Sequence, residues 1–119
     1  MRETIVNITE VLPATIANGS ALSGVLNLGG LRLFDIVVPS PWTTANLTFQ
    51  YSPDNGATWA NMYDIAGNEL TALAAAGRGI ALDPTLFAGI QFMQIRSGTS
   101  GTPVNQTQNS TLQLILRAV

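Results

Sequence analysis

The chain has 119 residues, of which 46% are hydrophobic and only 10% are charged, and it contains neither cysteine nor histidine. This length fits one domain, and the missing residues exclude a disulfide framework, a thiolate metal site and the commonest general base. The net charge is −2 and the basic residues are single arginines spread along the chain, so we expect no nucleic-acid partner. Because the commonest general base is missing, an enzyme is the least favoured class of protein.

Short strands separated by turn residues are predicted along most of the chain. The segments with strand patterns are residues 4–9, 22–28, 31–38, 47–51, 59–65, 78–82, 90–97 and 112–117. Gly29-Gly30 is predicted to close a tight hairpin, Asp83-Pro84 to begin one helical turn, and residues 70–77 to form a strand or loop. About eight short strands predict an all-β fold, a two-sheet sandwich of jelly-roll topology, as one domain over residues 1–119.

The central strands are predicted to form a hairpin around residues 52–58. Alternate residues of a strand share a face, so apolar residues at odd positions on both sides of the turn are expected to point into the sandwich. Trp42, between Pro41 and Thr43, is the aromatic residue expected nearest the surface. The odd-numbered set comprises Leu47, Phe49, Tyr51, Trp59, Tyr63 and Ile65.

The turn of this hairpin carries the most distinctive motif of the chain, formed by Ser52, Asp54, Gly56, Thr58 and Trp59. The motif resembles the Asp box of sialidases and other sugar-processing propellers. A propeller is excluded, because its blades must repeat at about 40 to 50 residues each and the motif occurs once. In a turn, the carboxylate can accept backbone N–H groups and the glycine can supply a positive φ. We therefore expect a structural turn that fixes strand register, with no catalytic role.

Two interpretations of this region as a binding site have less support than the structural turn. A calcium site could draw on Asp54, Asn55, Asp64, Asn68 and Glu69, but their spacing does not fit an EF-hand loop, so solvated turn residues are favoured. An aromatic platform for sugar rings could draw on Trp42, Tyr51, Trp59 and Tyr63, but core packing is favoured for all of them except Trp42. No cofactor is expected.

The surface of this chain is unusual because it has no lysine, the residue that commonly guards exposed sheet edges. A small domain leaves much surface outside its core, and charged residues usually keep that surface soluble. We therefore expect an oligomer or a subunit of a lattice. The first nine residues have polar interruptions where a signal peptide needs an apolar core, and no later run approaches the length of a membrane span, so we expect synthesis in the cytoplasm and no membrane partner.

Two longer segments, residues 41–64 and 82–106, together resemble a small β-sandwich domain found in structural proteins of tailed bacteriophages. The first segment matches the pattern W-x-x-A-x-L-T-F-x-x-S-x-D-x-G, and the second matches F-x-G-x-x-F-x-x-I-R-S-G-T. The matching residues are Trp42, Ala45, Leu47, Thr48, Phe49, Ser52, Asp54 and Gly56, then Phe87, Gly89, Phe92, Ile95, Arg96, Ser97, Gly98 and Thr99.

This resemblance implies a virion protein without catalysis, made in the host cytoplasm, and favours a head decoration or cement protein that binds the major capsid protein. It also implies a homo-oligomer, with a trimer expected. Alternatives are a carbohydrate- or receptor-binding module, or a neck or tail component of the virion. Residues 1–14, as an N-terminal arm or strand, and the long loop 97–109 are the expected partner contacts. The side chains singled out are Trp42, Ser97, Thr99, Pro103, Val104 and Asn105.

Overall fold

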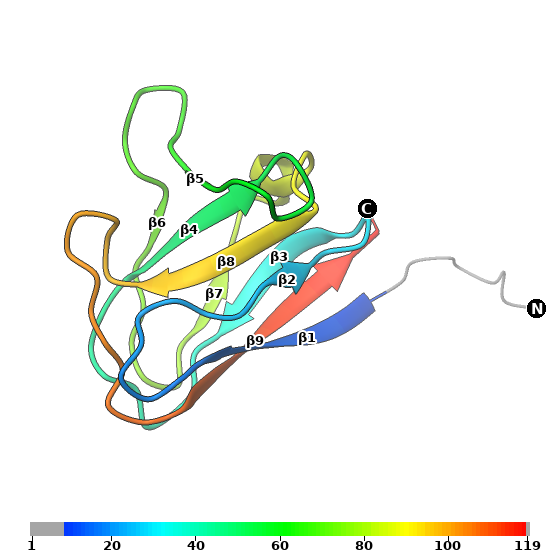
Figure 1. The fold of residues 1–119 in the computed structure, drawn as a ribbon. Coiled ribbons are helices and arrows are strands. Elements are labelled where there is room, and N and C mark those ends of the chain that lie inside the picture. The colour runs from blue at the N-terminus through cyan, green and yellow to red at the C-terminus, as the bar shows by residue number, and fades with distance from the viewer. Residues whose placement is uncertain (1–8, 119) are drawn as a thin grey trace, which may run out of the picture.

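Two antiparallel β-sheets face each other in the computed structural model of this chain, which describes residues 9–118 (Figure 1). The predicted all-β, two-sheet sandwich is confirmed. The strands are β1 (Thr9–Ile16), β2 (Leu26–Asn27), β3 (Arg32–Val37), β4 (Leu47–Ser52), β5 (Ala60–Asn61), β6 (Thr71–Ala72), β7 (Gly79–Ala81), β8 (Phe92–Ser97) and β9 (Ser110–Arg117), and the 3-10 helix η1 spans Pro84–Phe87.

The strand order is that of a jelly roll. The first sheet has the order β1-β9-β3-β7, and the second has the order β2-β8-β4-β5, with β6 also pairing with β4. Counting β5 and β6 as one position beside β4 gives four positions in each sheet. The first strand then lies beside the last, and the chain crosses between the sheets at most connections, as in two nested Greek keys.

The core lies between the sheets and follows the period of two along each long strand. In β9, Leu112, Leu114 and Leu116 are fully buried, which is the apolar face that their alternation predicts. In the second sheet, Phe49 of β4 meets Phe87 of η1 edge to face, with ring centroids 5.5 Å apart. The short helix therefore closes one end of the sandwich over the core.

The predicted helical turn at residues 83–88 is present as η1. The side chain of Asp83 accepts a hydrogen bond from the N–H of Thr85, and Pro84 occupies the first turn, where its missing N–H costs nothing. Just before η1, the N–H of Leu82 donates to the carbonyl of Phe34 in β3, and this bond holds the start of the helix beside that strand.

One predicted turn differs from the structure, and one predicted strand lies almost entirely outside the described residues. Gly29-Gly30 does not close a hairpin, because β2 belongs to the second sheet and β3 to the first; the two glycines, both with positive φ, carry the chain between sheets. The predicted strand 4–9 lies outside the described residues except for Thr9. The strand β1 overlaps residues 1–14, which were expected to form an arm or a strand, and its Pro13 is tolerated because β1 is an edge strand.

The prediction that odd-numbered residues face inward is wrong for the part of the hairpin after the turn. Tyr51 pairs with Ala60, so odd positions of β4 lie opposite even positions of β5. Met62 is therefore the buried residue, and its N–H donates to the carbonyl of Phe49 at 2.9 Å. Tyr63 is 55% exposed and Ile65 is fully exposed, although both were expected in the core.

Trp42 also differs from its predicted position near the surface. Its side chain is only 8% exposed and belongs to the core, and its indole Nε1–H donates to the carbonyl of Ala45 at 3.2 Å. The indole is large enough to cover the end of the sandwich, and the carbonyl of its own loop satisfies its single donor.

Candidate functional site

The Asp-box-like residues form one closed turn between β4 and β5. The hydroxyl of Ser52 donates to Oδ1 of Asp54 at 2.8 Å and accepts the N–H of Gly56 at 2.6 Å. Both carboxylate oxygens of Asp54 are held by Thr58, whose N–H donates to Oδ1 and whose hydroxyl donates to Oδ2. Trp59 follows the turn and is half-buried.

The electrostatics of this turn also indicate a structural carboxylate. Hydrogen bonds, first from the hydroxyl of Thr58 and then from its N–H, lower the pKa of Asp54 below its ordinary value of 3.8. A general acid needs the opposite shift, and a nucleophile needs an oxygen that is free to attack. Asn55 and Gly56 adopt positive φ, which turns the chain back toward the second sheet.

The second loop in this region is a turn around Asp64. Its Oδ1 accepts the N–H groups of Ala66 and Asn68, both at 2.9 Å, and these bonds lower the pKa of the carboxyl group. The acidic residues proposed as calcium ligands are thus used separately, Asp54 and Asp64 in two different turns and Glu69 beside Arg96. Among residues 9–118, no three acidic side chains gather closely enough to hold a metal ion.

Arg96 is the one buried charged residue of the part of the chain described here, and it organises the outer face of the second sheet. Its guanidinium lies 3.6 Å from the carboxylate of Glu69 and donates to Oδ1 of Asn61 at 2.8 Å. It also donates to Oε1 of Gln50 at 3.1 Å and to the hydroxyl of Thr48. The backbone N–H of Ser100 donates to the same carboxylate, at 3.2 Å from each oxygen.

This Arg96 cluster joins β4, β5, the loop after Asp64 and the loop after β8. The sequence does not predict this cluster, because Glu69 and Arg96 are far apart in the chain and no local spacing links them. The one local signal is an arginine next to the apolar residues of β8. Every donor or acceptor named in the cluster is already paired inside the chain, so the cluster is built to hold two loops in place.

The loop after β8 is held at both ends. At its start, the N–H of Val104 donates to the carbonyl of Ser97, and the hydroxyl of Ser97 donates to the carbonyl of Val104. At its end, the fully buried side chain of Gln106 accepts the N–H of Thr43 and donates to the carbonyl of the same residue, each at 3.0 Å. Between these anchors, Thr99, Thr102 and Pro103 are exposed to solvent.

The predicted partner contacts therefore fall into two groups. Trp42 and Ser97 are buried and present almost no surface to a partner. The side chains of Thr99, Pro103 and Asn105 are exposed, and Val104 is half-buried. A partner reaching this end of the molecule would meet the tip of the loop and not the tryptophan.

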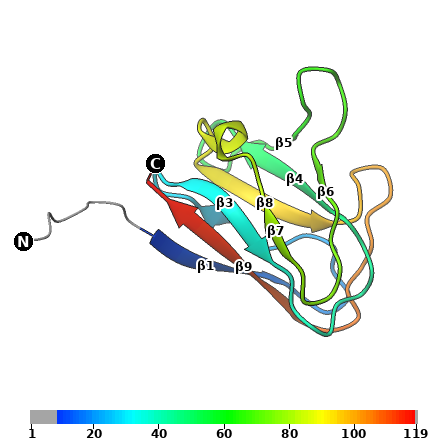
Figure 2. The same cartoon turned by 180° about the vertical axis from the view of Figure 1, so that it is seen from behind.

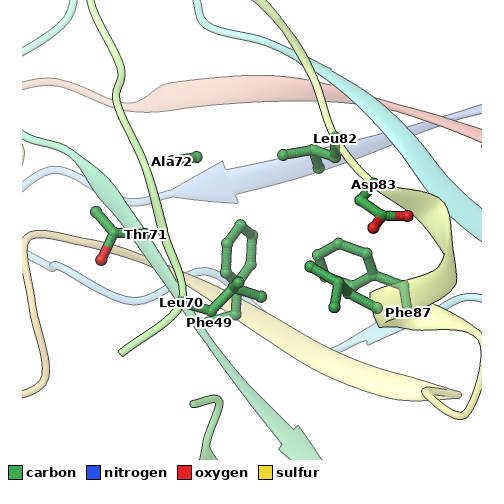
Figure 3. A pocket seen from close by; sticks show the side chains of 8 residues that line it. Phe49, Leu70, Thr71, Ala72, Leu82, Asp83 and Phe87 are labelled. Atoms are coloured by element: carbon green, nitrogen blue, oxygen red, sulfur yellow. The ribbon is translucent and has the colours of Figure 1, made fainter. Parts of the chain in front are cut away.

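A small pocket of about 40 Å³ opens between β6 and η1 (Figure 3). Its walls are mostly apolar side chains from the second sheet, from Leu82 after β7 and from η1, and Asp83 stands at its rim with Oδ1 engaged by Thr85. The space admits only a few atoms, and none of its lining side chains is a nucleophile held by a base. The apolar lining residues are Phe49, Leu70, Ala72, Leu82, Leu86 and Phe87.

Exposed apolar side chains are the most unusual surface feature. The loop between β5 and β6 projects from the sandwich in both views, with Tyr63 and Ile65 on it (Figure 1, Figure 2). The hydrogen bonds of Asp64 close the turn around Ile65, whose side chain lies in water. The large exposed hydrophobic residues are Val11, Val25, Val37, Tyr63, Ile65, Leu73 and Leu86.

Comparison with known proteins does not assign this chain to a family. The chain matches no family model, no curated protein and no solved structure. In the described residues, no helix has the length and apolar character needed to cross a membrane. Function must therefore be argued from the arrangement of the residues themselves.

Proposed function

We propose that this protein is a structural subunit of a bacteriophage virion, a capsid decoration protein that docks on the major capsid lattice and stabilises it without catalysis. The observation that carries the proposal is Ile65, fully exposed in a turn that is closed by hydrogen bonds to Asp64. Leaving such a side chain in water forfeits about 1.5–3 kcal/mol of burial energy, which docking on a partner would recover.

The remaining surface chemistry supports the same class. The carboxylates of Asp54, Asp64 and Asp83 accept hydrogen bonds from their own turns, so they are already partnered when a neighbour approaches. Binding of a subunit to an assembled shell stabilises that shell by mass action. The resemblance of residues 41–64 and 82–106 to phage sandwich domains supports the virion as the place of assembly.

A carbohydrate-binding module has less support. Stacking of sugar rings needs exposed aromatic faces, and Trp42 is buried while Trp59 is half-buried. Tyr63 alone is well exposed, and one ring makes a poor platform. A neck or tail component would share the same surface chemistry, so its distinction from a decoration protein depends on location in the particle.

Electron cryomicroscopy of the virion is the direct test. We expect density of this size on the head surface, with the loop after β5 against the capsid protein. In a binding assay with purified shells lacking this protein, the Ile65→Ser variant should bind about tenfold less tightly. Val25→Ser is the matched control, because Val25 is also exposed and borders β2 at the opposite edge of the second sheet.

Density absent from the head, or present only at the neck or tail, would overturn the decoration role. Equal loss of shell binding in Ile65→Ser and Val25→Ser would show that the projecting loop is not the docking element. Selective binding to a glycan array, lost in Tyr63→Ala, would favour the carbohydrate-binding class instead.

A further inference from the structure

Two arginines lie side by side on the outer face of the first sheet. Arg32 of β3 is directly opposite Arg117 of β9, and residues opposed in an antiparallel pair share a face with Cβ atoms about 4.5–5.5 Å apart. The preceding pair on these strands, Leu33 and Leu116, is fully buried. Both arginines therefore point away from the core, at the end of the sheet where β9 finishes and β3 starts (Figure 1).

Among the described residues, no carboxylate forms an ion pair with the charges on this face. Within residues 9–118, the one ion pair closer than 4.0 Å is that of Arg96 with Glu69. Asp35 shares the outer face, opposite Ile115, but makes no such pair with either arginine. Like charges directly opposite each other destabilise a sheet, so this arrangement is costly to the chain by itself.

One donor of the pair is also unsatisfied. The Nε atom of Arg117 is buried and has no hydrogen-bond acceptor within the described residues. Buried donors are normally paired, so the hydrogen bonds of the Arg117 side chain are incomplete within this part of the chain. The guanidinium plane offers its donors as a fixed fork that matches the two oxygens of a carboxylate.

The surroundings indicate which anion fits. Val11, Val37 and Ile115 lie on the same face, the two valines well exposed and Ile115 half-buried. With Asp35 nearby, the two arginines leave a net charge of +1 on this part of the face, which suits one carboxylate better than a phosphate dianion. An aspartate or glutamate between apolar neighbours would match both the charge and the apolar side chains of Val11 and Ile115 on this face.

We propose that Arg32 and Arg117 form a binding site for a carboxylate side chain of a partner protein, presented on a segment with apolar residues on either side. This deepens the proposed function, on which it rests for the source of the partner, by naming the chemistry that the capsid surface would offer. The site itself can be tested on the isolated chain.

The test is an NMR titration that follows the arginine Nε–H signals. The probe is the capped tripeptide Leu-Glu-Leu, and the matched control is Leu-Gln-Leu, which has the same shape without the charge. We expect saturable shifts of Arg32 and Arg117 with the glutamate peptide, about tenfold weaker binding of the glutamine peptide, and no saturable shift of Arg78. Arg78 is the internal control because it is exposed and carries the same charge.

Arg117→Gln and, separately, Arg32→Gln should each weaken binding of the glutamate peptide about tenfold. Both variants should fold with an unchanged or slightly raised urea midpoint, because each removes a like-charge contact. No saturable shift, equal shifts at Arg78, or tighter binding of inorganic phosphate than of the peptide would overturn the site. If the peptide binds but the protein does not dock on shells, the proposed function is contradicted and the carboxylate site stands. If the protein docks on shells but the peptide does not bind, the carboxylate site is contradicted and the proposed function stands.

Discussion

The guanidinium of Arg96 lies 3.6 Å from the carboxylate of Glu69, with the two side chains only 10% and 14% exposed. Replacing Arg96 by methionine keeps the length of the side chain but leaves the carboxylate and the amide oxygen of Asn61 without this donor. Breaking a nearly buried pair by removing one partner costs about 3 kcal/mol, so we expect the free energy of unfolding in urea to fall by about that amount.

The matched controls for this change are Glu69→Leu and the double variant Arg96→Met/Glu69→Leu. With both charges gone, no buried charge is left alone, so the double variant should be more stable than Arg96→Met. A double variant less stable than either single variant would show that the two residues do not act as a pair.

Asp54→Ala should lower the melting temperature by a few degrees. The change removes the two oxygens that hold the N–H and hydroxyl of Thr58 and the hydroxyl of Ser52, so the turn loses the bonds that fix its shape. Circular dichroism during heating measures the effect. Asp54→Asn, which keeps one oxygen acceptor, should fall between the wild type and Asp54→Ala, and an unchanged melting temperature in both would contradict a structural role.

Acid should destabilise the fold through three turn carboxylates. Hydrogen bonds lower the pKa of Asp54, Asp64 and Asp83 below their ordinary value of 3.8. As the pH falls below 3.8, the unfolded chain therefore takes up protons before the folded chain does. The stability that these groups contribute is complete above that pH and is lost as the pH falls through their lower folded values. Urea midpoints between about pH 6 and about pH 2.5 measure this loss.

The control for the pH effect replaces all three carboxylates by asparagine. Its urea midpoint should be lower at neutral pH and should change less on acidification, because the groups with shifted pKa are gone. If the triple variant lost as much stability in acid as the wild type, other residues would carry the pH dependence.

Gly98→Ala should disrupt the loop after β8. Gly98 has a φ of +89°, and a Cβ there would lie 2.5 Å from the carbonyl oxygen of Thr102 and 2.7 Å from the backbone N of Val104. Because backbone atoms cannot move aside cheaply, we expect a loss of about 3 kcal/mol in urea unfolding. Gly101→Ala in the same loop has open space and is the matched control, with little expected change. Equal effects of the two changes would contradict this account.

Features that depend on neighbours in the chain were predictable from the sequence. The Asp83-Pro84 pair predicts η1, because a cap and a proline act within one turn. The alternation of Leu112, Leu114 and Leu116 predicts the buried face of β9, since a strand repeats every two residues. The number of short strands then favoured the sandwich.

Features that depend on register across a turn were not predictable. The inward face of the hairpin changes from odd to even positions because Tyr51 pairs with Ala60, and the sequence does not state how many residues the turn will leave unpaired. The burial of Trp42 has a similar origin, because a loop residue enters the core only when the two sheets leave room for it.

The sequence by itself determined that this chain is a low-charge, all-β domain with a self-satisfied turn at Asp54, because composition, alternation and turn chemistry act locally. Only the tertiary structure decided which side chains meet across the sheets. It brought Arg96 to Glu69 as an ion pair, and it set Arg32 opposite Arg117 within the described residues with no close carboxylate. Both contacts arise from strand pairing between distant segments, whose register depends on how the whole sandwich closes.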